Sequence, residues 1–364
     1  MTVDDDRDGV IPFPGGRTRT KESEGELAAG ALKSGWLTQG TEALGLQRAA
    51  DSLLGRQIVP VAGGSAALHL ALLAADIDEG AEVVLSGVSS YTTANLVIVA
   101  GGRAVFADIE APDRPFLDAA DANRVASPET RAIVMAHEGG YPAPTQGLRR
   151  IADDRDLVLI EDCRGALGAV TDTGPVGTTG DLAAFAFGDT PVSGGFVGCS
   201  SEELRRRLET LRSTVIPTDE ECFSHDCADT MANGYRIDEA AAAAGSQELA
   251  RLEDGVRRRQ AQAAAAADAL GAAGLHVCRP PEPEGRPTWR SVMVLADSRL
   301  RRDALAATLR RAGLQASVPV AAFLQPPHNA RVPRRPLPNS QEFCERGLQI
   351  AVVPALAERV ATLL

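Results

Sequence analysis

Apolar residues recur along the chain with two different spacings. Segments with apolar positions three or four residues apart predict helices, and short apolar runs bounded by glycine or polar residues predict buried strands. The two kinds alternate from about residue 41 to about residue 200, which favours βαβ units and a mostly parallel sheet between helices. The expected helices are residues 41–55, 65–75, 92–102 and 146–156, and the expected strands are 81–87, 103–109, 131–137, 157–163 and 181–188.

The second half of the chain begins with a long helical tract. It covers residues 237–272, and we expect it to be interrupted near Gly245. After a proline-rich loop, a strand at 289–296, a helix at 301–313 and a last helix from about Asn339 indicate a smaller α/β unit.

The first 29 residues differ from the rest. They are acidic, contain several glycines and prolines and lack apolar periodicity, which is typical of a flexible arm. We therefore expect three parts: the arm (1–29), a large domain (30–240), and a connecting helix with a small C-terminal domain (241–364).

Composition excludes several classes of function. The formal net charge of −12 argues against a nucleic-acid partner, because phosphate binding needs a basic surface. No apolar run approaches the ~20 residues of a membrane span, and the start lacks the basic and apolar segments of a signal peptide. We expect a cytoplasmic protein without a membrane partner, with its six cysteines reduced.

Lysine is almost missing from the chain. Among the 37 basic residues only Lys21 and Lys33 are lysines, and both lie in the first tenth of the sequence. No lysine amine is therefore available anywhere in the body of the protein.

Several sequence blocks follow one another in an order that resembles one enzyme family. They include "SGWLTQGTEALGLQRAADSLLG", "VAGGSAALHLALLAADIDEGAEVVLSG", "LVLIEDCRGALGA", "VGTTGDLAAFAFG" and "NGYRIDEAAAAAGSQELARL". Over roughly residues 30–357 the chain resembles the DegT/StrS-type sugar aminotransferases. The resemblance implies the α/β fold type I of pyridoxal-phosphate (PLP) enzymes. Such a fold has a large domain with a mostly parallel seven-stranded sheet between helices, a small α/β C-terminal domain, and a dimer that builds each site from two chains.

The resemblance also assigns cofactor contacts. Gly64, Ser65 and Ala66 match the family's phosphate-binding block, where backbone N–H groups open a helix. Asp162, after the strand "LVLIED", stands where the family keeps the carboxylate of the pyridine nitrogen. Taken alone, the same residues would be ordinary helix caps. Tyr235 belongs to the family's Tyr-Arg pair.

Departures from the family gather in the same site. Where the family usually has a ring-stacking aromatic residue, the chain has Ser90, with Tyr91 one step out of register. The usual glutamine and phosphate-contacting serine are Gly165 and Ala186. Other family residues are replaced as well: a histidine by Leu167 and an asparagine by Gly234.

The Schiff-base lysine of the family is Pro191 in this chain. A proline side chain carries no nucleophile, so neither covalent PLP nor transamination by the usual route is expected. PLP or its pyridoxamine form (PMP) remains possible as a noncovalent ligand.

Some relatives work without the lysine. The sugar 3-dehydratases hold PMP noncovalently and use a histidine as base, and one branch carries an iron–sulfur cluster on cysteines. His137 is the candidate base here, with an ordinary hydrogen-bonded histidine as the alternative. A metal or cluster could be held by one group of residues, although thiols without a metal are the favoured interpretation: Cys163, Cys222, His225 and Cys227.

Two hypotheses follow from these observations. In the first, the chain is a degenerate, non-catalytic aminotransferase homologue that serves as a partner or binding scaffold in a sugar or natural-product biosynthetic pathway. It would be a homodimer, or a heterodimer with a lysine-bearing homologue. In the second, it is a repurposed lysine-independent PLP or PMP enzyme, a dehydratase or lyase, acting on a modified sugar or similar small molecule.

Overall fold

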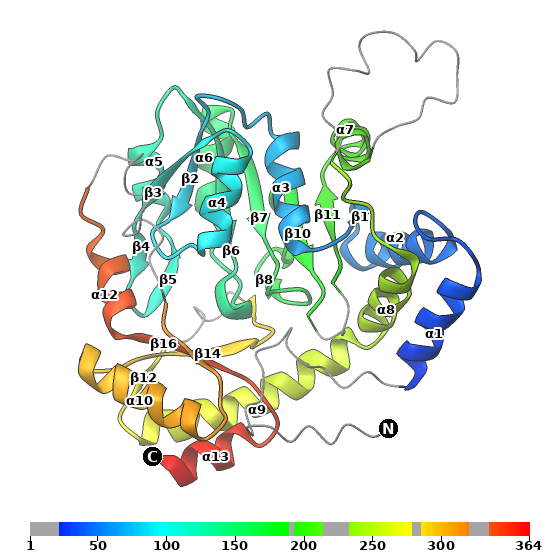
Figure 1. Ribbon diagram of the computed structural model, residues 1–364. Coiled ribbons are helices and arrows are strands. Elements are labelled where there is room, and N and C mark those ends of the chain that lie inside the picture. The colour runs from blue at the N-terminus through cyan, green and yellow to red at the C-terminus, as the bar shows by residue number, and fades with distance from the viewer. Residues whose placement is uncertain (1–21, 189–192, 214–232, 279–284, 320–334) are drawn as a thin grey trace, which may run out of the picture.

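A large seven-stranded sheet forms the centre of the protein (Figure 1). The computed structural model describes residues 22–188, 193–213, 233–278, 285–319 and 335–364. Five neighbouring strands are parallel, and β11 is antiparallel to both of its neighbours, as the sequence predicts for a mostly parallel sheet. The strand order is β1 (Gln57–Val61), β11 (Gly195–Cys199), β10 (Leu182–Ala186), β7 (Val158–Asp162), β6 (Thr130–Ala136), β2 (Glu82–Ser86) and β3 (Arg103–Ala107).

Both faces of this sheet are buried. Successive strand residues point to opposite faces, so Val83 and Leu85 of β2 enter one core cluster and Val84 enters another. One cluster lies under α3 (Gly64–Ala74), α4 (Tyr91–Val99) and α7 (Glu202–Arg212), and the other under α5 (Ala119–Val125) and α6 (Gln146–Arg155). This double burial explains why the strands are continuous apolar runs.

Three helices pack together beyond the β1 edge of the sheet: α1 (Glu22–Lys33), α2 (Thr41–Leu54) and α8 (Glu239–Ala250) (Figure 1). Residues 22–29, at the end of the expected arm, belong to helix α1, which packs on α8 and has Ala31 buried. The buried Glu239 carboxylate caps α2, accepting from the backbone N–H of Gly40 at 2.7 Å and of Glu42 at 2.9 Å.

The long helical tract breaks at a different place from the one expected. Helix α8 ends at Ala250 and α9 (Leu252–Ala272) begins after Arg251, whereas Gly245 lies inside α8. The ring of Phe187 occupies the space where a side chain at Gly245 would lie. Gly245 therefore allows close packing and does not end the helix.

A smaller antiparallel sheet forms the C-terminal unit, with α9 packed beside it (Figure 1). Its order is β12 (His276–Val277), β14 (Ser291–Leu295), β16 (Gly347–Ala351) and β15 (Ala316–Ser317). The last expected helix is α12 (Pro338–Arg346). It is followed by β16 and a further helix, which the sequence did not predict. Other elements are α10 (Arg299–Arg311), α13 (Leu356–Leu363), η1 (Glu138–Gly140), β4 (Ile109–Ala111), β5 (Arg114–Leu117), β8 (Val170–Thr171), β9 (Gly174–Pro175) and β13 (Gly285–Arg286).

Within the described ranges, no helix carries an apolar stretch long enough to cross a lipid bilayer.

Candidate functional site

Two strand ends and two helix starts meet at one edge of the large sheet. Asp162 ends β7 and bonds to Thr93 in the first turn of α4, while Ala186 ends β10 and lies against Gly64 at the start of α3. The carboxyl ends of parallel strands are where ligands bind in open α/β sheets. This edge therefore brings together several of the residues that the sequence selected, including Gly64, Ala66, Ser90, Asp162 and Ala186.

The Asp162 carboxylate is held by an arginine two residues further along the chain. Arg164 donates from Nε to Oδ1 at 2.8 Å and from Nη2 to Oδ2 at 2.7 Å, a two-pronged ion pair. Thr93 Oγ1 donates to Oδ2 at 3.2 Å and accepts from Arg164 Nη2 at 2.8 Å. Both carboxylate oxygens are therefore occupied by groups of the chain itself.

The electrostatics of this cluster follow from its burial. Burial alone would raise the pKa of Asp162, but the charge and hydrogen bonds of Arg164 outweigh it and hold the pKa below its usual value. Glu138, just after β6, lies near the same pair. Burial, together with the negative charge of Asp162, raises the pKa of Glu138 to about 7. The site thus contains one carboxylate that stays ionised and one carboxyl group that titrates near neutral pH.

The expected phosphate-binding block forms the first turn of α3. Gly63 is the N-cap and provides no side-chain cap, and Ser65 is exposed while Ala66 is half-buried. A side chain at Gly64 would lie 2.5 Å from Cβ of Ala186 and 3.1 Å from Cδ of Arg164, so a glycine is needed for the close approach of β10 to the helix.

Ser90 and Tyr91 have separate roles at the start of α4. The Ser90 hydroxyl caps the helix by accepting from Thr93 N at 3.2 Å, and it also lies 3.0 Å from Thr93 Oγ1. Tyr91 packs against the core cluster under α3 and α4, and burial, with a smaller contribution from Cys344, raises the pKa of its phenol. Ser90 supplies no ring at the family's stacking position.

Gly165 and Tyr235 complete the predicted set. A side chain at Gly165 would meet no heavy atom within 4 Å among the described residues other than its chain neighbours. Tyr235 accepts or donates through its hydroxyl at 2.8 Å from Nδ1 of His69 on α3, and its carbonyl accepts from Ala62 N at 2.9 Å. It therefore supports the loop that leads into α3.

His137 is fixed by structural hydrogen bonds. Its Nδ1 accepts from the backbone N–H of Ala143 at 2.9 Å, so Nε2 carries the proton and donates to Glu161 at 2.9 Å. Its side chain is fully buried, and Glu161 and Asp162, as strand neighbours, point to opposite faces of the sheet. The geometry favours the hydrogen-bonded alternative for His137 over a base that acts beside Asp162.

Cys163 lies close to His137 and Glu161, and the three could in principle ligate a metal ion. The Glu161 carboxylate, however, already accepts from four donors: His137 Nε2 and the backbone N–H groups of Gly177, Thr179 and Gly180. Burial, with the nearby Glu161 and Asp162 charges, raises the pKa of the Cys163 thiol well above its usual value. This cluster is unsuited to a metal.

Four residues of the sequence predictions lie outside the described residues: Pro191, Cys222, His225 and Cys227. The last described residue before Pro191 is Gly188. Its N–H donates to the buried Glu248 carboxylate at 2.9 Å, and its carbonyl accepts from Arg290 Nη2 at 3.4 Å.

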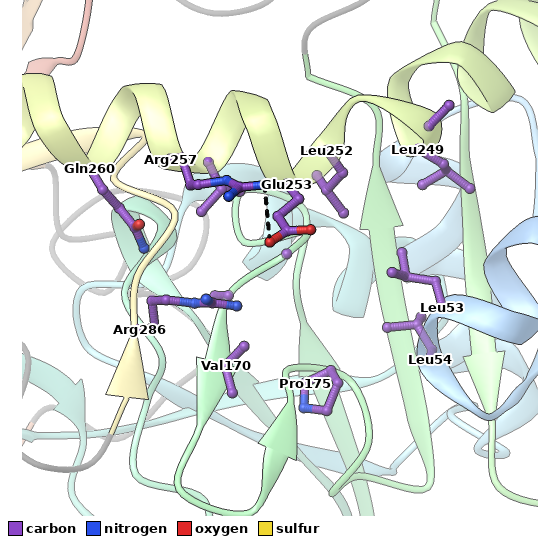
Figure 2. Close-up of a pocket in the computed structure, with 14 residues that line it drawn as sticks. Leu53, Leu54, Val170, Pro175, Leu249, Leu252, Glu253, Arg257, Gln260 and Arg286 are labelled. Atoms are coloured by element: carbon purple, nitrogen blue, oxygen red, sulfur yellow. Dashed lines mark ion pairs between the residues drawn. The ribbon is translucent and has the colours of Figure 1, made fainter.

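A separate pocket of about 360 Å³ lies between the end of α2, the β8–β9 hairpin and the α8–α9 junction (Figure 2). Its floor is apolar, and Arg257 pairs with Glu253 at 3.3 Å on its rim. None of the predicted site residues lines this pocket, and its polar side chains do not converge on one point (Figure 2).

Three residues that the sequence did not single out dominate the site: Thr93, Glu138 and Arg164. Of these, Arg164 was detectable, because a basic residue two positions after a strand-end aspartate can fold back onto it.

Comparison with known proteins agrees with this architecture. In solved structures the chain is similar to DesV of S. venezuelae, "in complex with ketimine intermediate" (28% identity, 94% of this chain and 93% of that one, TM-score 0.83). It is also similar to the sugar aminotransferase CalS13 of Micromonospora echinospora (26%, 97% and 99%, TM-score 0.84). The aminotransferase TlmJ of Streptoalloteichus hindustanus shares the fold (24%, 94% and 95%, TM-score 0.85).

These structures have the PLP fold type I, which the sequence resemblance implied. The sequence profile of the DegT/DnrJ/EryC1/StrS aminotransferase family matches residues 18–362, nearly the whole chain. The protein therefore belongs to the DegT/DnrJ/EryC1/StrS aminotransferase family.

Proposed function

We propose that this chain is a non-catalytic member of its family, acting as a partner or binding scaffold in a sugar or natural-product biosynthetic pathway. One observation carries the proposal: the chain has no lysine after Lys33. Without a lysine amine, PLP cannot be bound covalently and transamination has no nucleophile.

Lys33, the one lysine among the described residues, is not placed to substitute within its own chain. Lys33 is exposed at the end of α1, beyond the β1 edge of the sheet, three strands away from β7 (Figure 1). Lys21 lies outside the described residues. Ala186 and Gly165 also offer no side-chain hydrogen bond to a cofactor.

A labelling experiment tests this proposal. The protein is incubated with PLP, reduced with borohydride and mapped by peptide mass spectrometry, while a panel of amino donors is tested for amino-group transfer. We expect adducts only at Lys21, Lys33 or the terminal amine, and no transfer. A lysine-bearing aminotransferase of the family is the positive control. Transfer by the purified wild-type chain would refute the proposal.

The partner role is supported by an exposed apolar surface around the α1–α2 connection. Leu32, Trp36 and Leu37 are 64%, 66% and 68% exposed, an unusual concentration of large apolar side chains on a surface. We propose that this surface pairs with a second chain of the same fold, in the first instance another copy of this one.

The mass of the purified protein in solution tests this pairing. We expect light scattering to give twice 38.1 kDa for wild type and 38.1 kDa for Leu37→Asp. Leu300→Asp is a matched control, because Leu300 is 82% exposed on α10, in the C-terminal unit. A monomeric wild type would refute the homodimer and leave a lysine-bearing homologue as the partner to test by co-expression.

Glu138 supports a second candidate, a repurposed enzyme that performs an elimination on a modified sugar or similar molecule. A recessed carboxyl group with a pKa of about 7 is suited to proton transfer at neutral pH. Turnover of such a substrate by wild type, abolished in Glu138→Gln, would favour this function over the first.

A further inference from the structure

Asp162 and the first turn of α3 mark the two ends of the space that a PLP ring would need. In relatives, the aspartate meets the pyridine nitrogen and the helix turn meets the phosphate, so the ring lies between them. The same two places in this chain are occupied by Asp162 and by the Gly64 turn. Whatever lies between these two places decides whether a ring can enter.

The Arg164 side chain runs along this path. Its guanidinium pairs with Asp162 at 2.7 and 2.8 Å, and its Cγ and Cδ would lie 3.3 and 3.1 Å from a side chain at Gly64. It contacts the aspartate at one end and the helix turn at the other. An arginine side chain is therefore present where the ring would be.

Displacing this side chain is unfavourable for electrostatic reasons. The guanidinium stays charged at all accessible pH values, so it cannot leave the ion pair by losing its proton. Arg164 is only 18% exposed and also donates to Thr93, so an incoming ring would have to break three hydrogen bonds of the guanidinium, two to Asp162 and one to Thr93. The pyridinium would regain a single hydrogen bond to one oxygen.

We propose that Arg164 is a built-in substitute for the cofactor's pyridinium, which excludes both PLP and PMP from this site even as noncovalent ligands. The chain does not fit the cofactor of its family, and the misfit extends beyond the missing lysine. This inference concerns the same site as the proposed function. It rests on that proposal for the missing lysine, whereas the exclusion by Arg164 is argued separately.

Titration with PMP tests the inference, because PMP has no aldehyde and cannot label Lys21, Lys33 or the terminal amine. By calorimetry, we expect no saturable binding to wild type. For Arg164→Ala we expect binding tighter by about 10-fold or more, the typical value of a charge-assisted hydrogen bond that is freed for the ligand. Arg150→Ala, an exposed change on α6, should behave as wild type.

A double variant tests whether the gain in PMP binding needs the Asp162 carboxylate or only the space left by the Arg164 side chain. Asp162→Asn/Arg164→Ala opens the same cavity without the carboxylate, and it should bind PMP no better than wild type. If Arg164→Ala does not fold, Arg164→Ser also removes the charge and most of the side-chain volume, and it too should gain binding.

The outcomes distinguish this inference from the proposed function. Saturable PMP binding to wild type, or no gain in either folded variant, would overturn the exclusion. Binding to wild type without amino-group transfer would overturn the exclusion alone. Transfer by wild type would overturn both.

Discussion

Substitution of the buried Glu161 offers the most direct test of what stabilises the loops beside β7. Oε1 accepts from the N–H groups of Thr179 and Gly180 at 2.8 and 2.6 Å, and Oε2 accepts from Gly177 N at 2.8 Å and His137 Nε2 at 2.9 Å. Glu161→Gln keeps one oxygen and turns the other into a donor, so two N–H groups lose their acceptor in either orientation of the amide. His137 cannot change tautomer, because its Nδ1 already accepts from the backbone.

The expected cost follows from this count. Each buried donor left without an acceptor costs about 1–3 kcal/mol, so two should lower the free energy of unfolding by about 2–6 kcal/mol. Urea unfolding followed by circular dichroism measures the change. Glu203→Gln, an exposed substitution on α7, should lie within about 0.5 kcal/mol of wild type. A loss below about 1 kcal/mol for Glu161→Gln would show that the carboxylate does not hold these loops.

Three further predictions concern a titrating group, a helix cap and a thiol. The pKa of Glu138 rises from 4.5 to about 7 on folding, so the folded state binds more protons and loses stability as pH rises through that window. Glu138→Gln should therefore gain in thermal midpoint over wild type between pH 5 and pH 8, and an equal difference at both pH values would contradict this. The Asp108 Oδ1 atom accepts from Ser340 N and Oγ at 2.7 and 2.6 Å at the start of α12. Asp108→Ala should therefore lower the free energy of unfolding by about 2–4 kcal/mol and speed amide hydrogen exchange in α12. Unchanged exchange would show that Asp108 does not cap this helix. Cys163, fully buried with a raised thiol pKa, should react with iodoacetamide only after denaturation, and labelling in the native state by peptide mapping would show that it is accessible.

Most of the large sheet is predictable from the sequence because its strands are buried on both faces. The expected helix at 41–55 is α2 (Thr41–Leu54), and the expected strand at 157–163 is β7 (Val158–Asp162). Strand β1 gave no comparable signal, because Pro60 cannot donate a hydrogen bond and is tolerated only at the edge of the sheet. The predicted helix break near Gly245 was wrong, because this glycine allows close packing against Phe187, a contact that only the folded chain reveals.

The candidate site was predictable in its location and not in its chemistry. Glycine and strand-end patterns place Gly64 and Asp162 at one edge of the sheet, and the structure brings them together there. The direction of the Arg164 side chain is not encoded locally, since the same residue could have pointed to solvent. The raised pKa of Glu138 likewise depends on burial and on the charge of Asp162, which belongs to another strand.

The Asp162–Arg164 pair also balances a buried charge within the chain itself. A carboxylate 7% exposed at a strand end needs a positive partner, since a buried unpaired charge costs several kcal/mol. In a PLP-binding relative the pyridinium meets that need, so an empty site leaves the aspartate uncompensated. Here Arg164 meets it from two residues away, with Thr93 bonded to both. The charge of Asp162 is therefore balanced within the chain, in agreement with the proposed exclusion of the cofactor and with the small side chains at Ser90, Gly165 and Ala186.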